Sequence, residues 1–130
     1  MTFYQLLPVL AVLGFLIFVG MVLTRQRRAS PWGLAGLSGA FLAFSIFVIS
    51  RDGIVEVWLN HTQNAWGNQV WIDLLMAVAL GTALLVPRAR ALGMNIPVWI
   101  FLICATASIA LYAMAARVIY LERRRSDMPN

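Results

Sequence analysis

The segment WIDLLMAVALGTALLVPRARALGMN, residues 71–95, determines how the rest of the chain is arranged. It contains an apolar run with one acid near its start, Asp73, and it ends in a short basic turn that leads into a further apolar run. Apolar helices of about 20 residues cross the hydrocarbon core of a bilayer, which is about 30 Å thick. The segment therefore predicts a helical hairpin in lipid.

The composition of the whole chain agrees with this interpretation. Of its 130 residues, 62% are hydrophobic, whereas a soluble domain has about 45–50% apolar residues. Backbone polar groups in lipid must be satisfied internally, and helices do this within one segment. We therefore expect an all-α integral membrane protein.

Four apolar segments have the length of a span, so we expect a single domain, 1–130, of four transmembrane helices. Their expected bounds are about 4–24, 31–50, 69–87 and 96–120, by length and composition. Between the second and third, residues 53–68 mix apolar and polar side chains. Ile54 and Trp58 stand four apart, as do Val55 and Leu59, which is the spacing of one side of a helix. We predict a short amphipathic helix in the membrane interface here.

The charge of the chain is carried by ten arginines without any lysine, and the formal net charge is +5. These arginines lie between or beyond the apolar segments, with Arg117 near the end of the last one. This distribution is typical of topology determinants and headgroup contacts, so we expect phospholipids and no nucleic acid as partners. The expected headgroup contacts are Arg25, Arg27, Arg28, Arg88, Arg90, Arg123, Arg124 and Arg125.

The number of arginines does not determine the orientation of four such spans, because five arginines would lie on each side of the membrane. One side would have Arg25, Arg27, Arg28, Arg88 and Arg90, and the other Arg51, Arg117, Arg123, Arg124 and Arg125. Charges near the first span and in short loops usually dominate, which places the first group in the cytoplasm and both termini outside. Interfacial aromatic residues would then form two belts, Tyr4, Trp71 and Tyr120 in one, Trp32 and Trp99 in the other.

Small residues in the second segment suggest a helix-packing interface. Ala35 and Gly39 are four residues apart, and so are Gly36 and Ala40. Small residues at this spacing let two helix backbones approach closely in lipid. We predict that this face meets another helix, which belongs either to this chain or to a partner.

Few residues suggest chemistry. Asp73 is an acid inside a span, where it costs about 2.5–3.5 kcal/mol at the centre of the bilayer. It is therefore either a functional intramembrane site or an anchoring contact near the interface. His61 is the single histidine and Cys104 the single cysteine, and we interpret them as an interfacial side chain and a packing residue.

Three motifs of the C-terminal half occur in a fixed order: Asp73-Leu74-Leu75, the turn from Arg88 to Met94, and the tail from Tyr120 to Arg124. In these motifs the chain resembles a family of small bacterial membrane proteins of unknown function. The chain departs from the family where a Phe-Ala-Leu-Pro segment is usual, since Ala107 to Ala110 stands there. The resemblance implies a bacterial source and this architecture, without an activity.

The residue inventory does not favour an enzyme. The sequence has no cluster with metal-ligand spacing, no Ser-His-Asp set and no glycine-rich phosphate loop. We expect no catalytic residue, cofactor or metal. The favoured function is an accessory subunit or assembly factor of the bacterial inner membrane, multi-pass, that docks on a larger membrane complex or on copies of itself. The alternative is a small transporter or a proton- or cation-conducting oligomer that uses Asp73.

Overall fold

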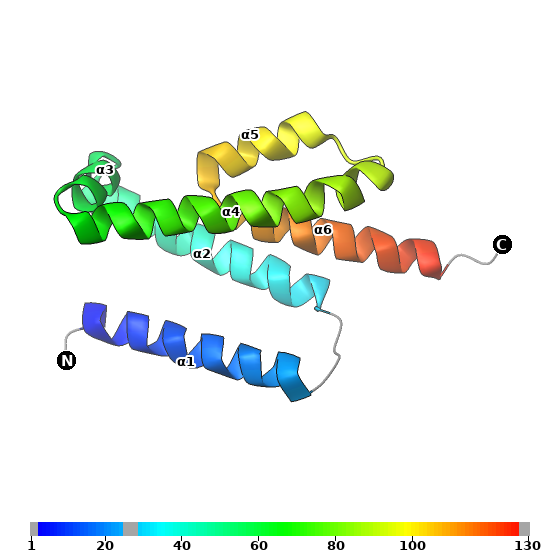
Figure 1. Cartoon of the computed structure of the whole chain (residues 1–130), viewed down its shortest axis with the longest axis horizontal. Coiled ribbons are helices and arrows are strands. Elements are labelled where there is room, and N and C mark those ends of the chain that lie inside the picture. The colour runs from blue at the N-terminus through cyan, green and yellow to red at the C-terminus, as the bar shows by residue number, and fades with distance from the viewer. Residues whose placement is uncertain (1–2, 25–28, 128–130) are drawn as a thin grey trace.

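The computed structural model describes residues 3–24 and 29–127 of the chain (Figure 1). Over these residues it is all-α, which confirms the predicted fold class. The six helices are α1 (Phe3–Thr24), α2 (Pro31–Asp52), α3 (Val55–Thr62), α4 (Ala65–Ala91), α5 (Ile96–Thr106) and α6 (Ser108–Ser126). The short helix expected between the second and third segments is present as α3.

Among the residues whose side chains the structure describes, two helices rather than the predicted four are long and apolar enough to cross a membrane. They are α2 and α4, and α4 extends beyond the expected 69–87 at both ends. Gln5–Gly20 of α1 and the whole of α5 are shorter apolar helices. The segment 96–120 was predicted as one span, and this prediction is wrong because the segment is divided between α5 and α6.

The division occurs at Ala107, whose φ of 49° and ψ of −115° are incompatible with a continuing helix. At 1.5 Å per residue, the 11 residues of α5 are about 16 Å long, which is about half of a 30 Å hydrocarbon core. Helix α6 then runs back toward the end at which α5 began (Figure 1). The two helices therefore form a hairpin whose two outer ends lie at the same end of the molecule.

Thr106 satisfies backbone groups on both sides of this break. Its hydroxyl donates to the carbonyl of Leu102 at 2.9 Å and accepts from the N–H of Ala110 at 3.2 Å. The same side chain therefore bonds back into α5 and caps the start of α6, a role for which threonine is suited.

Local signals also explain the turn between α4 and α5. Gly93 has a φ of 72°, and the N–H of Met94 donates to the carbonyl of Ala89 at 3.0 Å. This is the Schellman arrangement, in which glycine adopts the left-handed conformation after the last helical residues. The predicted helical hairpin at this turn is confirmed.

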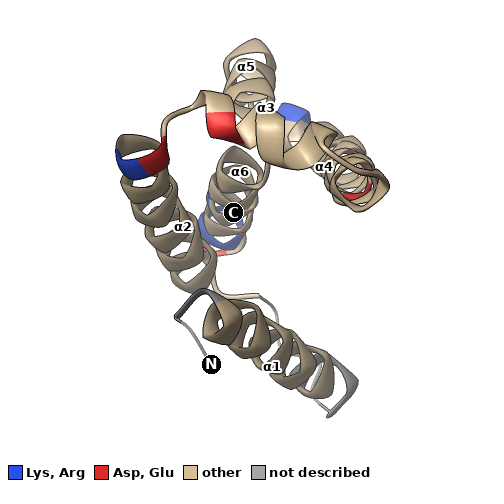
Figure 2. Cartoon of the chain, turned by 90° about the vertical axis from the view of Figure 1, so that its left-hand side faces the viewer, with Lys and Arg blue, Asp and Glu red and all other residues tan. Residues whose placement is uncertain are grey.

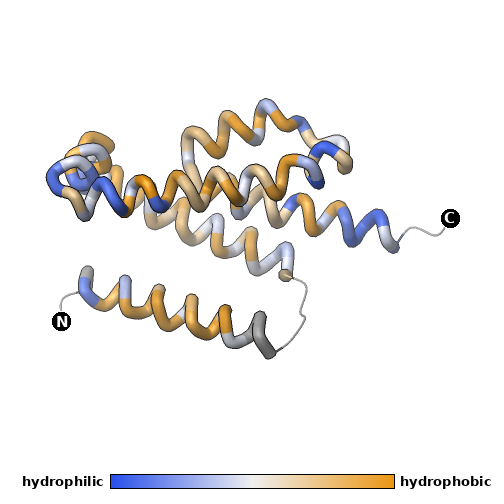
Figure 3. Tube along the Cα trace, viewed as in Figure 1, coloured by the Kyte–Doolittle hydropathy of each residue, from blue (hydrophilic) through white to orange (hydrophobic). Residues whose placement is uncertain are grey.

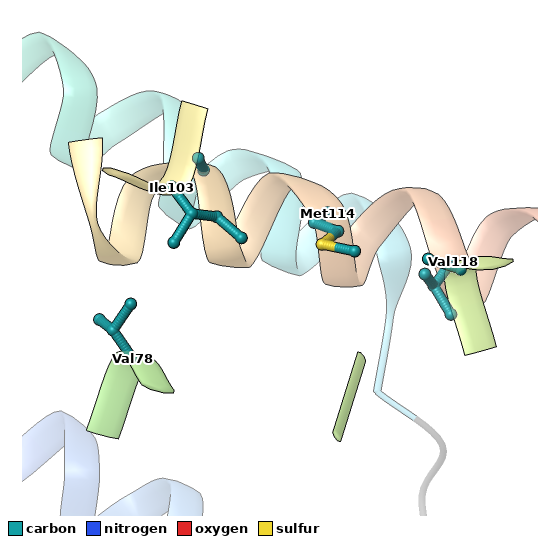
Figure 4. Packing of buried hydrophobic residues seen from close by; sticks show 6 residues of the cluster. Val78, Ile103, Met114 and Val118 are labelled. Carbon is teal, nitrogen blue, oxygen red and sulfur yellow. The ribbon is translucent and has the colours of Figure 1, made fainter. Parts of the chain in front are cut away.

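Helix α6 lies at the centre of the packing, among α2, α4 and α5 (Figure 2). Met114 and Val118 of α6 are fully buried, and they pack with Val78 of α4 and Ile103 of α5 (Figure 4). A Cβ atom at Gly81 of α4 would come within 2.6 Å of the Leu111 side chain, so α4 and α6 approach closely there. By contrast, none of the described side chains of α1, residues 5–20, is buried.

Candidate functional site

The ends of three helices are joined at one end of the molecule, which we call the arginine end. It consists of residues 29–32, 88–95 and 117–127, and it lies on the right in Figure 1. Arg88 of α4 donates from Nε and Nη2 to the two carboxylate oxygens of Glu122 in α6, at 2.9 and 2.7 Å. Arg123 donates to the carbonyl of Ala29 at 3.1 Å, next to the start of α2. The end of α6 is therefore beside the end of α4 and the start of α2.

These contacts correct the predicted topology. Arg117 and the run Arg123–Arg125 lie at the same end as Arg88 and Arg90, so the expected division of five arginines against five is wrong. Six of the seven arginines that the structure describes are at this end, and Arg51 is at the other. Arg25, Arg27 and Arg28 lie outside the described residues. Polar residues lie toward the ends and apolar residues toward the middle of the helices (Figure 3).

An open groove of about 1010 Å³ lies at the arginine end, between α2, α6 and the α4–α5 turn. Its aromatic residues are Trp32, Trp99 and Tyr120, and its single charged residue is Arg117. The rings of Trp32 and Tyr120 meet edge to face, with centroids 6.3 Å apart. The prediction that Tyr120 marks the interface opposite to Trp32 is therefore wrong, again because residues 96–120 do not form one span.

Small side chains form the floor of this groove. These are Ala35 and Gly39 of α2 and Ala113 and Ala116 of α6. The absence of larger side chains at these positions leaves the space open. Neither the groove nor the position of Arg117 in it was predicted, because both depend on the reversal at Ala107.

The contact between α2 and α6 is centred on Ser38, which we did not single out from the sequence. Ser38 is buried, and its hydroxyl donates to the carbonyl of Ile109 at 2.8 Å. A hydroxyl flanked by small residues in a lipid-embedded helix is a signal of interhelical hydrogen bonding. That signal is present in the sequence between Gly36 and Gly39.

The four residues of the predicted packing interface lie on two different faces. Ala35 and Gly39 line the groove, whereas Gly36 and Ala40 do not. All four are exposed, and a Cβ atom at Gly36 or Gly39 would have no neighbour within 4 Å. The docking of another helix on these residues stays a prediction, and Gly36 with Ala40 is the pair that remains free for it.

Asp73 is exposed on α4, in a shallow depression that Trp66, Gln69 and Met76 also line. Within the described residues no hydrogen bond or ion pair to its carboxylate is formed. Two polar side chains near the same end of the molecule have other partners, since Asn68 donates to the Asn64 carbonyl at 3.1 Å and Arg51 is 3.5 Å from Asp52. Asp73 lies outside the buried cluster, which α4 contacts through Leu74, Val78, Leu85, Val86 and Ala89.

At the end opposite to the arginine end, α3 packs against the start of α4. The His61 ring lies 5.3 Å from the ring of Trp71, and its Nδ1 is 2.6 Å from the Val57 carbonyl. Since a carbonyl only accepts, Nδ1 carries the proton in this contact. A Cβ atom at Gly67 would lie 2.8 Å from the Asn60 carbonyl oxygen, so this approach requires glycine. In the described part of the chain, no three acidic, histidine or cysteine side chains are grouped as a metal site would need.

Comparisons with known proteins give no relative of this chain. No family model, no curated protein and no solved structure matches it. The function must therefore be argued from the residues and their arrangement alone.

Proposed function

We propose that this chain is a non-catalytic accessory subunit or assembly factor that docks on a larger complex of the bacterial inner membrane. The observation that carries the proposal is the pair Gly36 and Ala40 on α2, which the described chain leaves uncovered. Small residues gain nothing by facing lipid, whereas they permit close backbone packing against a helix. A helix of another chain is the partner that fits this surface.

Helix α1 supports the same proposal. Its described side chains are apolar on all faces apart from Gln5, and none is buried. In Figure 2 it lies apart from the group formed by α2, α4, α5 and α6. An apolar helix that its own chain does not cover adds surface for contact with a partner in the membrane.

Asp73 also favours docking over transport. A carboxylate within a span is costly unless a donor or counter-ion satisfies it, and the described chain supplies neither. A donor from a partner on the outer face of α4 would satisfy it. Transport through Asp73, the alternative function, would need a pathway between copies of the chain, because Asp73 is directed away from the buried cluster.

The orientation that we propose follows from the positive-inside rule applied to the structure. With Arg88, Arg90, Arg117 and Arg123–Arg125 at one end, that end is cytoplasmic. The C-terminus is then in the cytoplasm, which replaces our expectation that both termini are outside. Helix α3 and the start of α4 face the opposite side.

The docking proposal is tested with Gly36→Leu, purified in a mild detergent at native expression. We expect loss of the co-purifying complex with an unchanged thermal midpoint of the chain itself, because a Cβ atom at residue 36 would have no neighbour within 4 Å. Ala83→Leu on an exposed part of α4 is the matched control and should keep the complex. Retention of the complex in Gly36→Leu, or a wild-type chain that brings down no other protein, would contradict the proposal.

The two functions are separated at Asp73. Under docking, Asp73→Asn should weaken the complex modestly, since asparagine still accepts a hydrogen bond, and Asp73→Leu should weaken it more. Under transport, Asp73→Asn should abolish proton or cation flux into vesicles that contain the purified chain. We expect no such flux from the wild-type chain, and its detection would promote the alternative.

A further inference from the structure

We propose that the groove at the arginine end binds one anionic glycerophospholipid, with the lipid phosphate on Arg117 and an acyl chain along the small-residue floor. This inference is independent of the docking proposal, which concerns Gly36 and Ala40 on another face of α2. The expected ligand is a lipid because the groove combines one cation, an aromatic rim and an apolar floor.

The first argument is the position of Arg117. It precedes Glu122 by five residues, or about 7.5 Å along α6, so it lies deeper in the bilayer than the Arg88–Glu122 pair. Its guanidinium makes no hydrogen bond or ion pair with any described residue. An arginine at this depth is stable when it reaches an anion near the headgroup level. The phosphate of a lipid is the anion that the membrane itself supplies at that depth.

The second argument is the surroundings of Arg117. Trp32, Trp99 and Tyr120 line the same groove, and tryptophan and tyrosine are enriched where headgroups meet the hydrocarbon region. Ala35, Gly39, Ala113 and Ala116 line the same groove and give it an apolar surface of small side chains, on which an alkyl chain can lie. A volume of about 1010 Å³ is at the upper limit of small-molecule sites, which range over about 300–1,000 Å³.

The third argument is the charge around the groove, which favours an anionic over a zwitterionic headgroup. Arg90, Arg123, Arg124 and Arg125 are all described at this end. Each arginine near an anionic membrane surface adds to the attraction of acidic lipids. A free anion would meet only Arg117 in an otherwise largely apolar groove, so the acyl chain is an essential part of the ligand.

The test uses the full chain in nanodiscs that contain equal amounts of phosphatidylglycerol and phosphatidylcholine, followed by native mass spectrometry of the lipid that stays bound. We expect wild type to retain one lipid, enriched in phosphatidylglycerol. Arg117→Gln should lower the bound ratio of phosphatidylglycerol to phosphatidylcholine about fivefold, the factor expected for one arginine. Gly39→Leu, which fills the floor, should lower retention of both lipids.

Two controls make the result specific. Arg124→Gln removes the same charge from the same end without lining the groove, and it should lower the ratio clearly less than Arg117→Gln does. Inorganic phosphate in millimolar excess should not displace the lipid. An unchanged ratio in Arg117→Gln, an equal loss in Arg124→Gln, displacement by phosphate, or full retention in Gly39→Leu would each overturn the proposal.

The thermal midpoint of Arg117→Lys, which keeps the charge, should match wild type and shows that position 117 tolerates substitution.

Discussion

Helix α4 and the α5–α6 hairpin arise from neighbouring apolar stretches of the chain, yet they have different architectures. Helix α4 continues for 27 residues, about 40 Å at 1.5 Å per residue. The next stretch stops after the 11 residues of α5 and reverses at Ala107. The difference lies in the residues at the middle. Residues 78–84 of α4 are mainly apolar with one hydroxyl, Thr82, whereas the hairpin has Thr106, Ala107 and Ser108 in succession.

The comparison shows that apolar length alone does not determine whether a segment crosses. A break in lipid leaves backbone groups without helical partners, and it is tolerated where protein supplies them. Thr106 supplies both a donor and an acceptor at the break, and Ser38 of α2 donates to the carbonyl of Ile109 in the first turn of α6. The middle of α4 also has a hydroxyl, Thr82, but it donates to the Val78 carbonyl at 2.7 Å within a continuous helix. The hairpin differs because its hydroxyls bond backbone groups on both sides of a break.

The largest expected effect concerns the side on which the chain ends. In a Cys104→Ser background, we expect Ala91→Cys and Asp127→Cys to react with an impermeant maleimide from the same side of sealed vesicles, because the ends of α4 and α6 are joined through Arg88 and Glu122. Gln63→Cys, next to α3, should react from the other side. If residues 127 and 63 were labelled from the same side of the vesicles, residues 96–120 would form one uninterrupted span.

A second prediction concerns one methionine in each of the two regions, the α5–α6 hairpin and helix α4. Met114→Ala in α6 should destabilise the fold by about 2 kcal/mol, because the side chain is fully buried and leaves a cavity. Met76→Ala in α4 should have almost no effect, since Met76 is 68% exposed. Denaturation in mixed micelles measures both, and equal costs would show that α6 is not the centre of the packing.

A third prediction tests the backbone at the break. Ala107→Gly should stabilise the chain by about 1 kcal/mol, since a non-glycine residue at positive φ is strained. Ala105→Gly, two residues earlier within α5, should instead cost about 0.5–1 kcal/mol as in other helix interiors. If both substitutions destabilise equally in the same denaturation assay, residue 107 is helical and the hairpin is wrong.

The smallest expected effect is at the contact between α2 and α6. Ser38→Ala should cost about 0.6 kcal/mol, the average for interhelical hydrogen bonds in lipid. Ser50→Ala removes a hydroxyl that bonds only to the nearby Phe47 carbonyl and should change the unfolding free energy less. If Ser50→Ala lowered the unfolding free energy more than Ser38→Ala, the contact between α2 and α6 would not depend on Ser38.

Much of the fold was predictable because helix signals are local. Helices α2 and α5 begin at or next to a proline, Pro31 and Pro97. The turn after α4 contains Gly93, a residue that readily adopts the left-handed conformation found there. Ala107 carries no such signal, since alanine is the strongest helix former. The groove around Arg117 could not be predicted from the sequence for the same reason, because it exists only when α6 returns to the end where α2 begins.

The reversal at Ala107 also has a consequence for biosynthesis. A fourth span would have required the translocation of Glu122, the run Arg123–Arg125 and Asp127 through the membrane, and each arginine costs about 2.5–3.5 kcal/mol at the centre of the bilayer. In the orientation that we propose, a hairpin with both outer ends on one side would avoid this step. The arginine-rich tail would then remain in the compartment that contains the Arg88–Arg90 turn, and only the apolar part of the hairpin would have to partition into lipid.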